Sequence, residues 1–167
     1  MSSRISPEAF ERLYDEHAEG LLGFLAYQTG DRGLAEDIVA DTFERVLRTR
    51  SGWRGGAGEK TWLYAIAMNR VRDLARRRGA EARAVERVVF DQQTAVPIAG
   101  EDFGVVADRD LLQRALQTLP EEERAVVALR FGGDLSLSEI AELLDERQTT
   151  IEGRLYRGLR RLRDAAS

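Results

Sequence analysis

Two groups of arginines are the side chains whose type and spacing best suit the recognition of another molecule. They are Arg70, Arg72, Arg76, Arg77 and Arg78 near the middle of the chain, and Arg154, Arg157, Arg160, Arg161 and Arg163 near its end. A guanidinium presents a planar fork of donors that suits phosphate oxygens and guanine edges, so these groups indicate nucleic-acid binding. Either group alone would equally suit a solvated helix end, where cations stabilise the helix dipole, and a GC-rich genome would also favour arginine.

The composition excludes several classes of function. The chain has no cysteine, which rules out disulfides and thiolate metal sites, and its single histidine, His17, cannot form a histidine metal cluster. The sequence shows neither a nucleophile–base pair nor a phosphate-binding glycine loop, so we expect no enzyme activity, cofactor, metal or small-molecule substrate. The formal net charge of -4 leaves nucleic acid open, because binding depends on where positive charge concentrates.

Hydropathy gives an expectation about location. No apolar run approaches the roughly 18 residues of a membrane span, and the first residues lack the apolar run of a signal peptide. We therefore expect a cytoplasmic protein with no membrane partner.

Hydrophobic periodicity predicts that helices carry the arginines. Apolar residues at helical spacing predict a first helix over residues 7–28, a second over 34–47 and a third over 61–78, which ends in the first arginine group. A glycine-rich stretch, residues 51–58, separates the second and third helices. These three helices are expected to form one small bundle.

The second arginine group belongs to a second set of helices. An acidic stretch over residues 79–110 contains Pro97 and Gly100 and is interpreted as a linker, although its valines would also suit docking against a domain. Beyond it, apolar spacing predicts helices over 111–119 and 121–131, with Pro120 in the first turn of the latter.

The last two helices follow a helix-turn-helix pattern. Ser136 and Glu139 predict a capping box at the start of a short helix that ends at Leu144, and a last helix follows a turn at Asp145. Such a helix enters the major groove and reads base edges, while its later arginines neutralise phosphates. The predicted fold class is all-α, with two small helical domains joined by an acidic linker.

Four ordered motifs resemble those of the extracytoplasmic-function, or group four, sigma factors of bacterial RNA polymerase. They lie at residues 35–43 (AEDIVADTF), 61–70 (TWLYAIAMNR), 116–120 (LQTLP) and 135–141 (LSLSEIA). The resemblance implies a sigma-two-like domain over residues 1–79, an acidic linker over 80–104 and a sigma-four-like domain over 105–167. It implies an initiation factor that binds core RNA polymerase, reads and melts the minus-ten promoter element, and binds the minus-thirty-five element.

The resemblance also assigns contacts to residues. The polymerase clamp would be gripped by Glu36, Asp37, Asp41, Glu44 and Arg45, although a solvated acidic face fits the same residues. The minus-ten contacts would come from Arg54, Lys60, Asn69, Arg70, Arg72, Arg76 and Arg77. In this set Asn69 would capture a base flipped out of the melted strand, and the arginines would follow the backbone. Trp62 lies on the apolar stripe and is assigned to the core.

The minus-thirty-five contacts would come from Thr150, Glu152, Arg154, Tyr156, Arg157, Arg160 and Arg161. The family usually has glycine at the position of Asp145, but aspartate tolerates the left-handed conformation, so the turn is expected to survive. A capping box of Asp145 with Gln148, or of Thr149 with Glu152, would replace the usual cap; otherwise Glu152 faces the groove. A further departure, Glu59 in place of a frequent aromatic residue, would put a carboxylate close to the single strand.

The implied partners are core RNA polymerase, through its β′ clamp and β subunit, promoter DNA and an anti-sigma factor. The linker would pass near the active-site cleft of the polymerase. Two other interpretations fit part of the sequence. A freestanding helix-turn-helix regulator leaves Asn69 and residues 70–78 unexplained, and a degenerate sigma-like module that occupies core without starting transcription is supported by the altered turn at 145–153.

Overall fold

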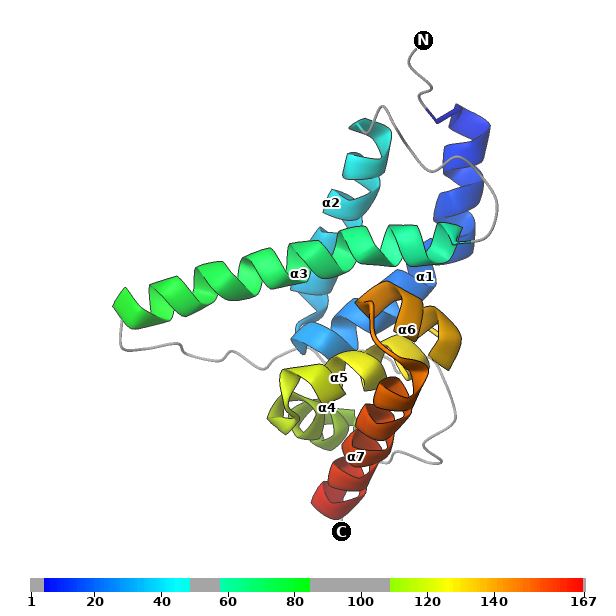
Figure 1. Ribbon diagram of the computed structural model, residues 1–167. Helices are drawn as coiled ribbons and strands as arrows, with labels where there is room; N and C mark the ends of the chain where they lie inside the picture. Colours follow the sequence, from blue (N-terminus) through cyan, green and yellow to red (C-terminus); the bar gives the residue numbers. More distant parts are fainter. Residues whose placement is uncertain (1–4, 49–57, 85–108, 167) are drawn as a thin grey trace.

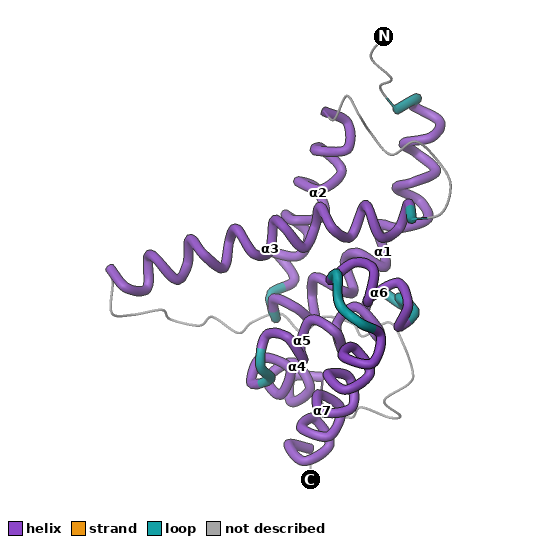
Figure 2. The backbone as a smooth tube through the Cα atoms, in the orientation of Figure 1, coloured by secondary structure: helices purple, strands orange, loops and turns teal. Residues whose placement is uncertain are grey.

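The computed structural model describes residues 5–48, 58–84 and 109–166, and the regular secondary structure in these residues is helical throughout (Figure 1, Figure 2). The elements are α1 (Pro7–Thr29), α2 (Arg32–Arg48), α3 (Glu59–Ala84), α4 (Arg109–Thr118), α5 (Glu121–Val127), the π-helical turn η1 (Ala128–Gly132), α6 (Leu137–Leu144) and α7 (Gln148–Ala166). The prediction of an all-α fold is confirmed. Most of the predicted linker, together with Arg54, lies outside the described residues.

The first two helices are bounded by residues that satisfy the helix ends. Ser6 caps α1 by accepting a hydrogen bond from the backbone N–H of Ala9 at 3.2 Å, and Gly30 ends the helix in a left-handed conformation with φ 71°. Asp31 then accepts a hydrogen bond from the backbone N–H of Leu34 at 3.1 Å, near the start of α2. This short turn lets α2 fold back along α1.

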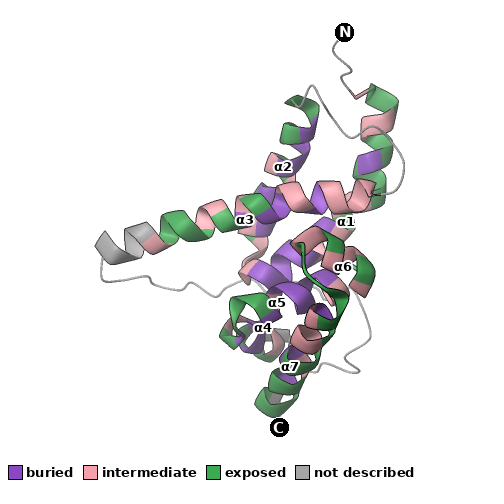
Figure 3. Cartoon of the chain, in the orientation of Figure 1, coloured by how far each residue is buried: buried purple, intermediate pink, exposed green. Residues whose placement is uncertain are grey.

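The third helix is longer than the apolar pattern predicts. α3 runs from Glu59 to Ala84, past the expected helix end at residue 78 and the expected domain boundary at residue 79. Its first half contributes buried residues such as Leu63 to the core, whereas its second half projects from the molecule and is mainly exposed (Figure 1, Figure 3). Beyond Leu74 the helix is built largely from arginine, alanine and glutamate, which are strong helix formers without an apolar stripe.

The C-terminal half packs α4, α5, η1, α6 and α7 around a second group of buried side chains. The fully buried ones include Leu116, Leu129, Leu135, Ile140 and Ile151. The capping box of α6 forms as predicted, because Ser136 Oγ accepts from the N–H of Glu139 at 3.1 Å and Glu139 Oε1 accepts from the N–H of Ser136 at 2.8 Å. Helix α5 continues into η1, where the N–H of Gly133 donates to the carbonyl of Ala128 at 3.0 Å.

The two halves are packed against each other and share one continuous core, which the sequence did not indicate. Helix α1 packs on η1, where Gly23 and Gly132 meet backbone to backbone. A Cβ added to either glycine would lie 2.6 Å from the carbonyl oxygen of the other. A larger residue at either position would therefore push the two halves apart.

Two hydrogen bonds from α3 reach the segment that follows η1. The hydroxyl of Tyr64 donates to the carbonyl oxygen of Gly133 at 3.3 Å, and Lys60 Nζ donates to the carbonyl oxygen of Asp134 at 3.1 Å. Burial raises the pKa of Tyr64, so its hydroxyl stays a neutral donor. We call these contacts of Gly23, Lys60 and Tyr64 with residues 132–134 the joint.

Candidate nucleic-acid and polymerase interface

The side chains predicted to bind polymerase lie along one side of α2. Glu36, Asp37, Glu44 and Arg45 are exposed, and Asp41 is partly exposed. Glu36 and Glu44 each pair with an arginine one turn away on the same helix. Because such surface pairs are worth only about 0.3–0.5 kcal/mol, these carboxylates stay available to a partner.

The predicted minus-ten residues that lie within the described part of the chain are carried by α3. Asn69, Arg72, Arg76 and Arg77 are exposed, and the first three follow one another at helical spacing on one face. Trp62 packs against the core, as predicted. Because α3 projects, this row of polar and basic side chains is open to a nucleic-acid strand.

A hollow between α2 and α3 brings together residues from two predicted sites. Its volume is about 630 Å³, and its lining includes Asp41, Glu44, Arg45, Asn69 and Arg70. Across it, Arg70 Nε donates to Asp41 Oδ2 at 3.1 Å. A residue predicted to bind DNA is thus paired with one predicted to bind polymerase.

A second hollow, of about 750 Å³, follows the projecting half of α3. Its lining includes Asn69, Arg72 and Arg76 of α3 and Glu121 of α5. Asn69 lines both hollows. Both hollows are open to solvent on one side.

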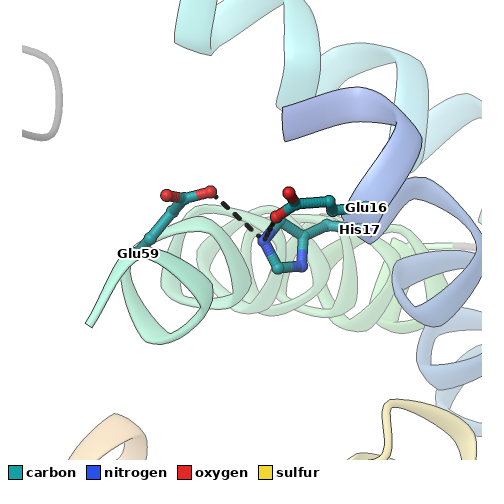
Figure 4. A group of neighbouring side chains, drawn as sticks. All are labelled: Glu16, His17 and Glu59. Carbon is teal, nitrogen blue, oxygen red and sulfur yellow. Dashed lines mark hydrogen bonds and ion pairs between the residues drawn. The ribbon is translucent and has the colours of Figure 1, made fainter. Parts of the chain in front are cut away.

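Charged side chains clamp the first turn of α3 to α1 (Figure 4). His17 Nε2 lies 3.3 Å from Glu59 Oε1, and Arg12 donates to both carboxylate oxygens of Glu59 at 3.2 Å. Arg12 also lies 3.2 Å from Glu16, one turn along α1. The Glu59 side chain is 13% exposed. The carboxylate that we expected near the single strand is therefore held against α1.

The same cluster contains a group of side chains, all within the described residues, that could offer several ligand atoms to one metal ion. Glu16, His17 and Glu59 each offer one, and these atoms lie within 4.8 Å of one another. Arg12 already bridges the two carboxylates, and its hydrogen bonds to Glu59 raise the pKa of Arg12. Because the guanidinium supplies the positive charge, we interpret the cluster as an ion-pair clamp.

The turn between α6 and α7 keeps its geometry despite its unusual sequence. Asp145 adopts the left-handed conformation with φ 53°, as predicted. Helix α7 begins at Gln148, so Thr149 lies within its first turn and Asp145 lies outside it; neither proposed replacement capping box fits this start. Glu152 is exposed and accepts a hydrogen bond from Gln148 Nε2 at 3.3 Å.

Arg154 is held by acidic side chains that the sequence interpretation missed. Its side chain is 15% exposed, and its guanidinium lies 3.2 Å from Glu146 and 3.8 Å from Glu122. A cation already held by two carboxylates is a poor candidate for reading a base. Glu122 is remote from Arg154 in the sequence, so helical periodicity did not indicate this contact.

Glu123 holds two further arginines of α7. Its side chain is 9% exposed, and its carboxylate lies 2.9 Å from Arg161 and 4.0 Å from Arg157. Three consecutive glutamates follow Pro120, and they include the two that pair with arginines of α7. From the sequence alone, acidic residues in this position predict only a favourable interaction with the helix N-terminus. The remaining predicted residues of α7 are more open: Tyr156 is 68% exposed, Arg160 is exposed and Thr150 is partly exposed.

Comparison with known proteins agrees with this arrangement. Residues 13–81 match Sigma-70 region 2, and residues 109–162 match Sigma-70, region 4. The RNA polymerase sigma factor CarQ of Myxococcus xanthus is 33% identical over 159 residues, which cover 94% of this chain and 88% of CarQ. The chain belongs to the RNA polymerase sigma factors. The ECF RNA polymerase sigma factor SigL of Mycobacterium tuberculosis is 32% identical over 152 residues, covering 90% and 85% of the two chains, which places this sigma factor in the ECF group.

A solved structure supports the fold of this sigma factor. The sigma factor RpoE of Bartonella quintana, crystallised with the anti-sigma factor NepR, matches with a TM-score of 0.78 at 24% identity, covering 94% of this chain and 96% of that one. Family membership makes the chain an alternative sigma factor that acts in transcription initiation with core RNA polymerase and promoter DNA. Among the described helices, none is long and apolar enough to cross a membrane.

The two matched regions coincide with the two packed halves of this sigma factor. Region 2 holds the hollow between α2 and α3, and region 4 holds the helix-turn-helix of α6 and α7. The joint lies between the regions, since Gly23 belongs to the first and Gly132 to the second.

Proposed function

We propose that this sigma factor directs core RNA polymerase to promoters through three surfaces. The exposed face of α2 binds the polymerase, α3 and its hollows take the melted minus-ten strand, and α7 binds the minus-thirty-five duplex. The position of Asn69, exposed and lining both hollows beside a row of arginines, is the observation that carries this proposal. The chain itself contributes binding and positioning, and nucleotide addition belongs to the polymerase.

The polymerase contacts are assigned to α2. Glu36, Asp37, Glu44 and Arg45 are exposed on a helix whose opposite side is buried in region 2. Their charges suit basic and acidic side chains of the β′ clamp, and complementary charge speeds association.

The minus-ten contacts are assigned to α3. A base that leaves the duplex exposes its Watson–Crick edge, and the amide of Asn69 both donates and accepts, so it suits such an edge. Arg72, Arg76 and Arg77 continue along the exposed side and suit the backbone phosphates. Lys60 joins them once its bond to Asp134 is released, and Arg54 is assigned from the family resemblance.

The minus-thirty-five contacts are assigned to a smaller set on α7 than the sequence predicted. Thr150, Tyr156, Arg157 and Arg160 are at least partly exposed and suit base edges or phosphates. Arg154 is assigned to the packing of α7 instead, because it is held by two glutamates. Glu152 is paired with Gln148 within α7, and Arg161 lies 2.9 Å from Glu123, so each binds DNA only if its bond exchanges. Arg157 lies 4.0 Å from the same carboxylate, so it is held more weakly and stays in the set.

Action on a promoter requires the joint to open. Elements centred near minus ten and minus thirty-five lie roughly 25 base pairs apart, or about 85 Å of B-form duplex. A compact chain of this length has a radius of gyration of only about 15 Å. We infer that regions 2 and 4 separate on the polymerase, which also frees Lys60.

An anti-sigma factor is a further proposed partner. The sigma factor RpoE was solved with the anti-sigma factor NepR, and CnrH was solved with the cytosolic domain of CnrY. By analogy, we infer that an anti-sigma factor binds this chain and covers α2. The proposed place of action is the cytoplasm, where core polymerase meets promoter DNA.

The first test is to mix the purified chain with bacterial core RNA polymerase and map transcription starts on genomic DNA with and without it. We expect a stable complex and new starts that share elements near minus ten and minus thirty-five. Core binding without new starts would support the degenerate module. Duplex binding by the chain alone, without core binding, would support the freestanding regulator.

A further inference from the structure

The ion pair between Asp41 and Arg70 connects two surfaces to which the proposed function gives different partners. Arg70 on α3 donates through Nε to Asp41 Oδ2 on α2 at 3.1 Å. We propose that Asp41 is a positioning residue for Arg70 and holds its guanidinium ready for a phosphate of the melted minus-ten strand, beside the base captured at Asn69. This inference rests on the proposed function and moves Asp41 from the polymerase surface to the minus-ten site.

The chemistry of the bond supports this role. It uses Nε alone, and within the described part of the chain neither Nη group of Arg70 has a hydrogen-bond partner. A guanidinium anchored at Nε keeps its terminal fork, and that fork suits a phosphate bidentately. Fixing the side chain before the strand arrives also reduces the entropy lost on binding.

The location supports the same role. Asn69 and Arg70 are consecutive on α3, and both line the hollow that Asp41 borders from α2. Because both side chains line this hollow, a strand that places one base against Asn69 can present an adjoining phosphate to Arg70. The carboxylate of Asp41 therefore fixes the position of the Arg70 guanidinium in this hollow.

A purely structural role explains the pair less well. The core already joins α2 to α3 through buried residues such as Ile38 and Leu63. The side chains of Arg70 and Asp41 are 34% and 44% exposed, and ion pairs of that exposure add little to stability. What the pair supplies is the orientation of Arg70.

The experiment compares Asp41→Ala, Arg70→Ala and the double variant in the full chain assembled with core polymerase. Two quantities are measured: affinity for core, and affinity of the holoenzyme for a single-stranded oligonucleotide carrying the minus-ten sequence. We expect each single variant to weaken oligonucleotide binding about tenfold, since each loses one oriented charge-assisted contact, and the double variant to be no weaker than either. Core affinity should change less than about twofold, well below the tenfold effect of 1.4 kcal/mol.

Glu36→Ala is the matched control, because Glu36 is exposed on the same helix and does not line the hollow. It should lower core affinity and leave oligonucleotide binding by the assembled holoenzyme unchanged. A core-affinity loss in Asp41→Ala like that of Glu36→Ala, or losses that multiply in the double variant, would overturn the proposal. If the unaltered chain binds neither core nor the oligonucleotide, the proposed function itself has failed.

A charge-swapped variant separates positioning from cross-linking. Asp41→Arg combined with Arg70→Asp restores an ion pair between the helices but puts the guanidinium on α2. We expect this variant to unfold at the temperature of the unaltered chain and to bind the oligonucleotide as weakly as Arg70→Ala. Full recovery of binding would show that the pair acts as a cross-link.

Discussion

The exposed side of α3 and the exposed side of α7 both carry arginines predicted to bind DNA, but the two helices hold them differently. On α3, Arg70 pairs with Asp41 and Arg76 pairs with Asp73. Arg72 and Arg77 are exposed and take part in no ion pair within the described residues. On α7, Arg154 and Arg161 are held by carboxylates of α5 and of the turn. The second half of α3 projects from the molecule, whereas α7 packs along α5, which begins with glutamates (Figure 1).

This difference shows that an arginine at a predicted contact position has more than one use. Where an acidic helix packs alongside, the guanidinium serves first to hold the fold. Where the helix projects, the side chain contacts mainly water and residues of its own helix. A ligand therefore has only these contacts to displace. Region 2 therefore keeps Arg72 and Arg77 available to a ligand, whereas in region 4 Arg154 and Arg161 serve first to pack α7.

Substituting Gly132 should have the largest effect, because it acts on the joint between the two regions. In Gly132→Val the side chain would meet the backbone of Gly23, and overpacking of this kind lowers the free energy of unfolding by about 3 kcal/mol. Chemical denaturation measures the change. Gly79→Val is the control, because an added Cβ there meets nothing within 4 Å. Equal free energies of unfolding for the two variants would mean that Gly132 does not pack tightly against Gly23.

Neutralising Glu123 should release arginines of region 4, so that they become available to DNA as Arg72 of region 2 is. Glu123→Gln removes the charge that holds Arg157 and Arg161 and should lower the free energy of unfolding by about 1 kcal/mol, because both arginines are more than half exposed. The released arginines should also tighten binding of an arbitrary duplex, measured by fluorescence anisotropy. Glu121→Gln, on an exposed residue of the same turn, should leave duplex binding unchanged and lower the free energy of unfolding only by the roughly 0.3–1 kcal/mol of an acid at a helix N-terminus. Weaker duplex binding by Glu123→Gln would contradict this account.

Removing Arg154 tests whether a predicted base reader serves the fold. Arg154→Ala should lower the free energy of unfolding by about 1 kcal/mol, because it leaves Glu146 and Glu122 without their partner. Its effect on the sequence preference of the holoenzyme at the minus-thirty-five element should be small. A changed base preference in a promoter library would restore Arg154 to the reading set.

Removing Arg72 should have the smallest effect on stability and a clear effect on binding. Arg72→Ala should change the free energy of unfolding by less than about 0.5 kcal/mol, as expected for an exposed residue. If Arg72 contacts one phosphate, the slope of log affinity against log salt for a single strand should fall by about 0.7. An unchanged slope would remove Arg72 from the strand contacts.

Local patterns were sufficient wherever the physical cause was local. The capping box of Ser136 and Glu139 and the left-handed turn at Asp145 depend on residues a few positions apart, and both formed as predicted. The end of α3 was missed because apolar spacing stops at Leu74, while the helix continues on intrinsic propensity to Ala84. The sequence left open two capping boxes, Asp145 with Gln148 and Thr149 with Glu152. The start of α7 at Gln148 fits neither of them.

The sequence by itself determined that the chain is all-α, that it ends in a helix-turn-helix and that it resembles sigma factors, because helical period, caps and ordered motifs are local properties. Tertiary structure alone decided which charges stay free and how the halves meet. Glu123 reaches Arg161, Asp41 reaches Arg70 and Gly23 touches residue 132 across long stretches of chain. Such contacts depend on how helices pack, and helical periodicity records only that a face is buried, without recording its partner.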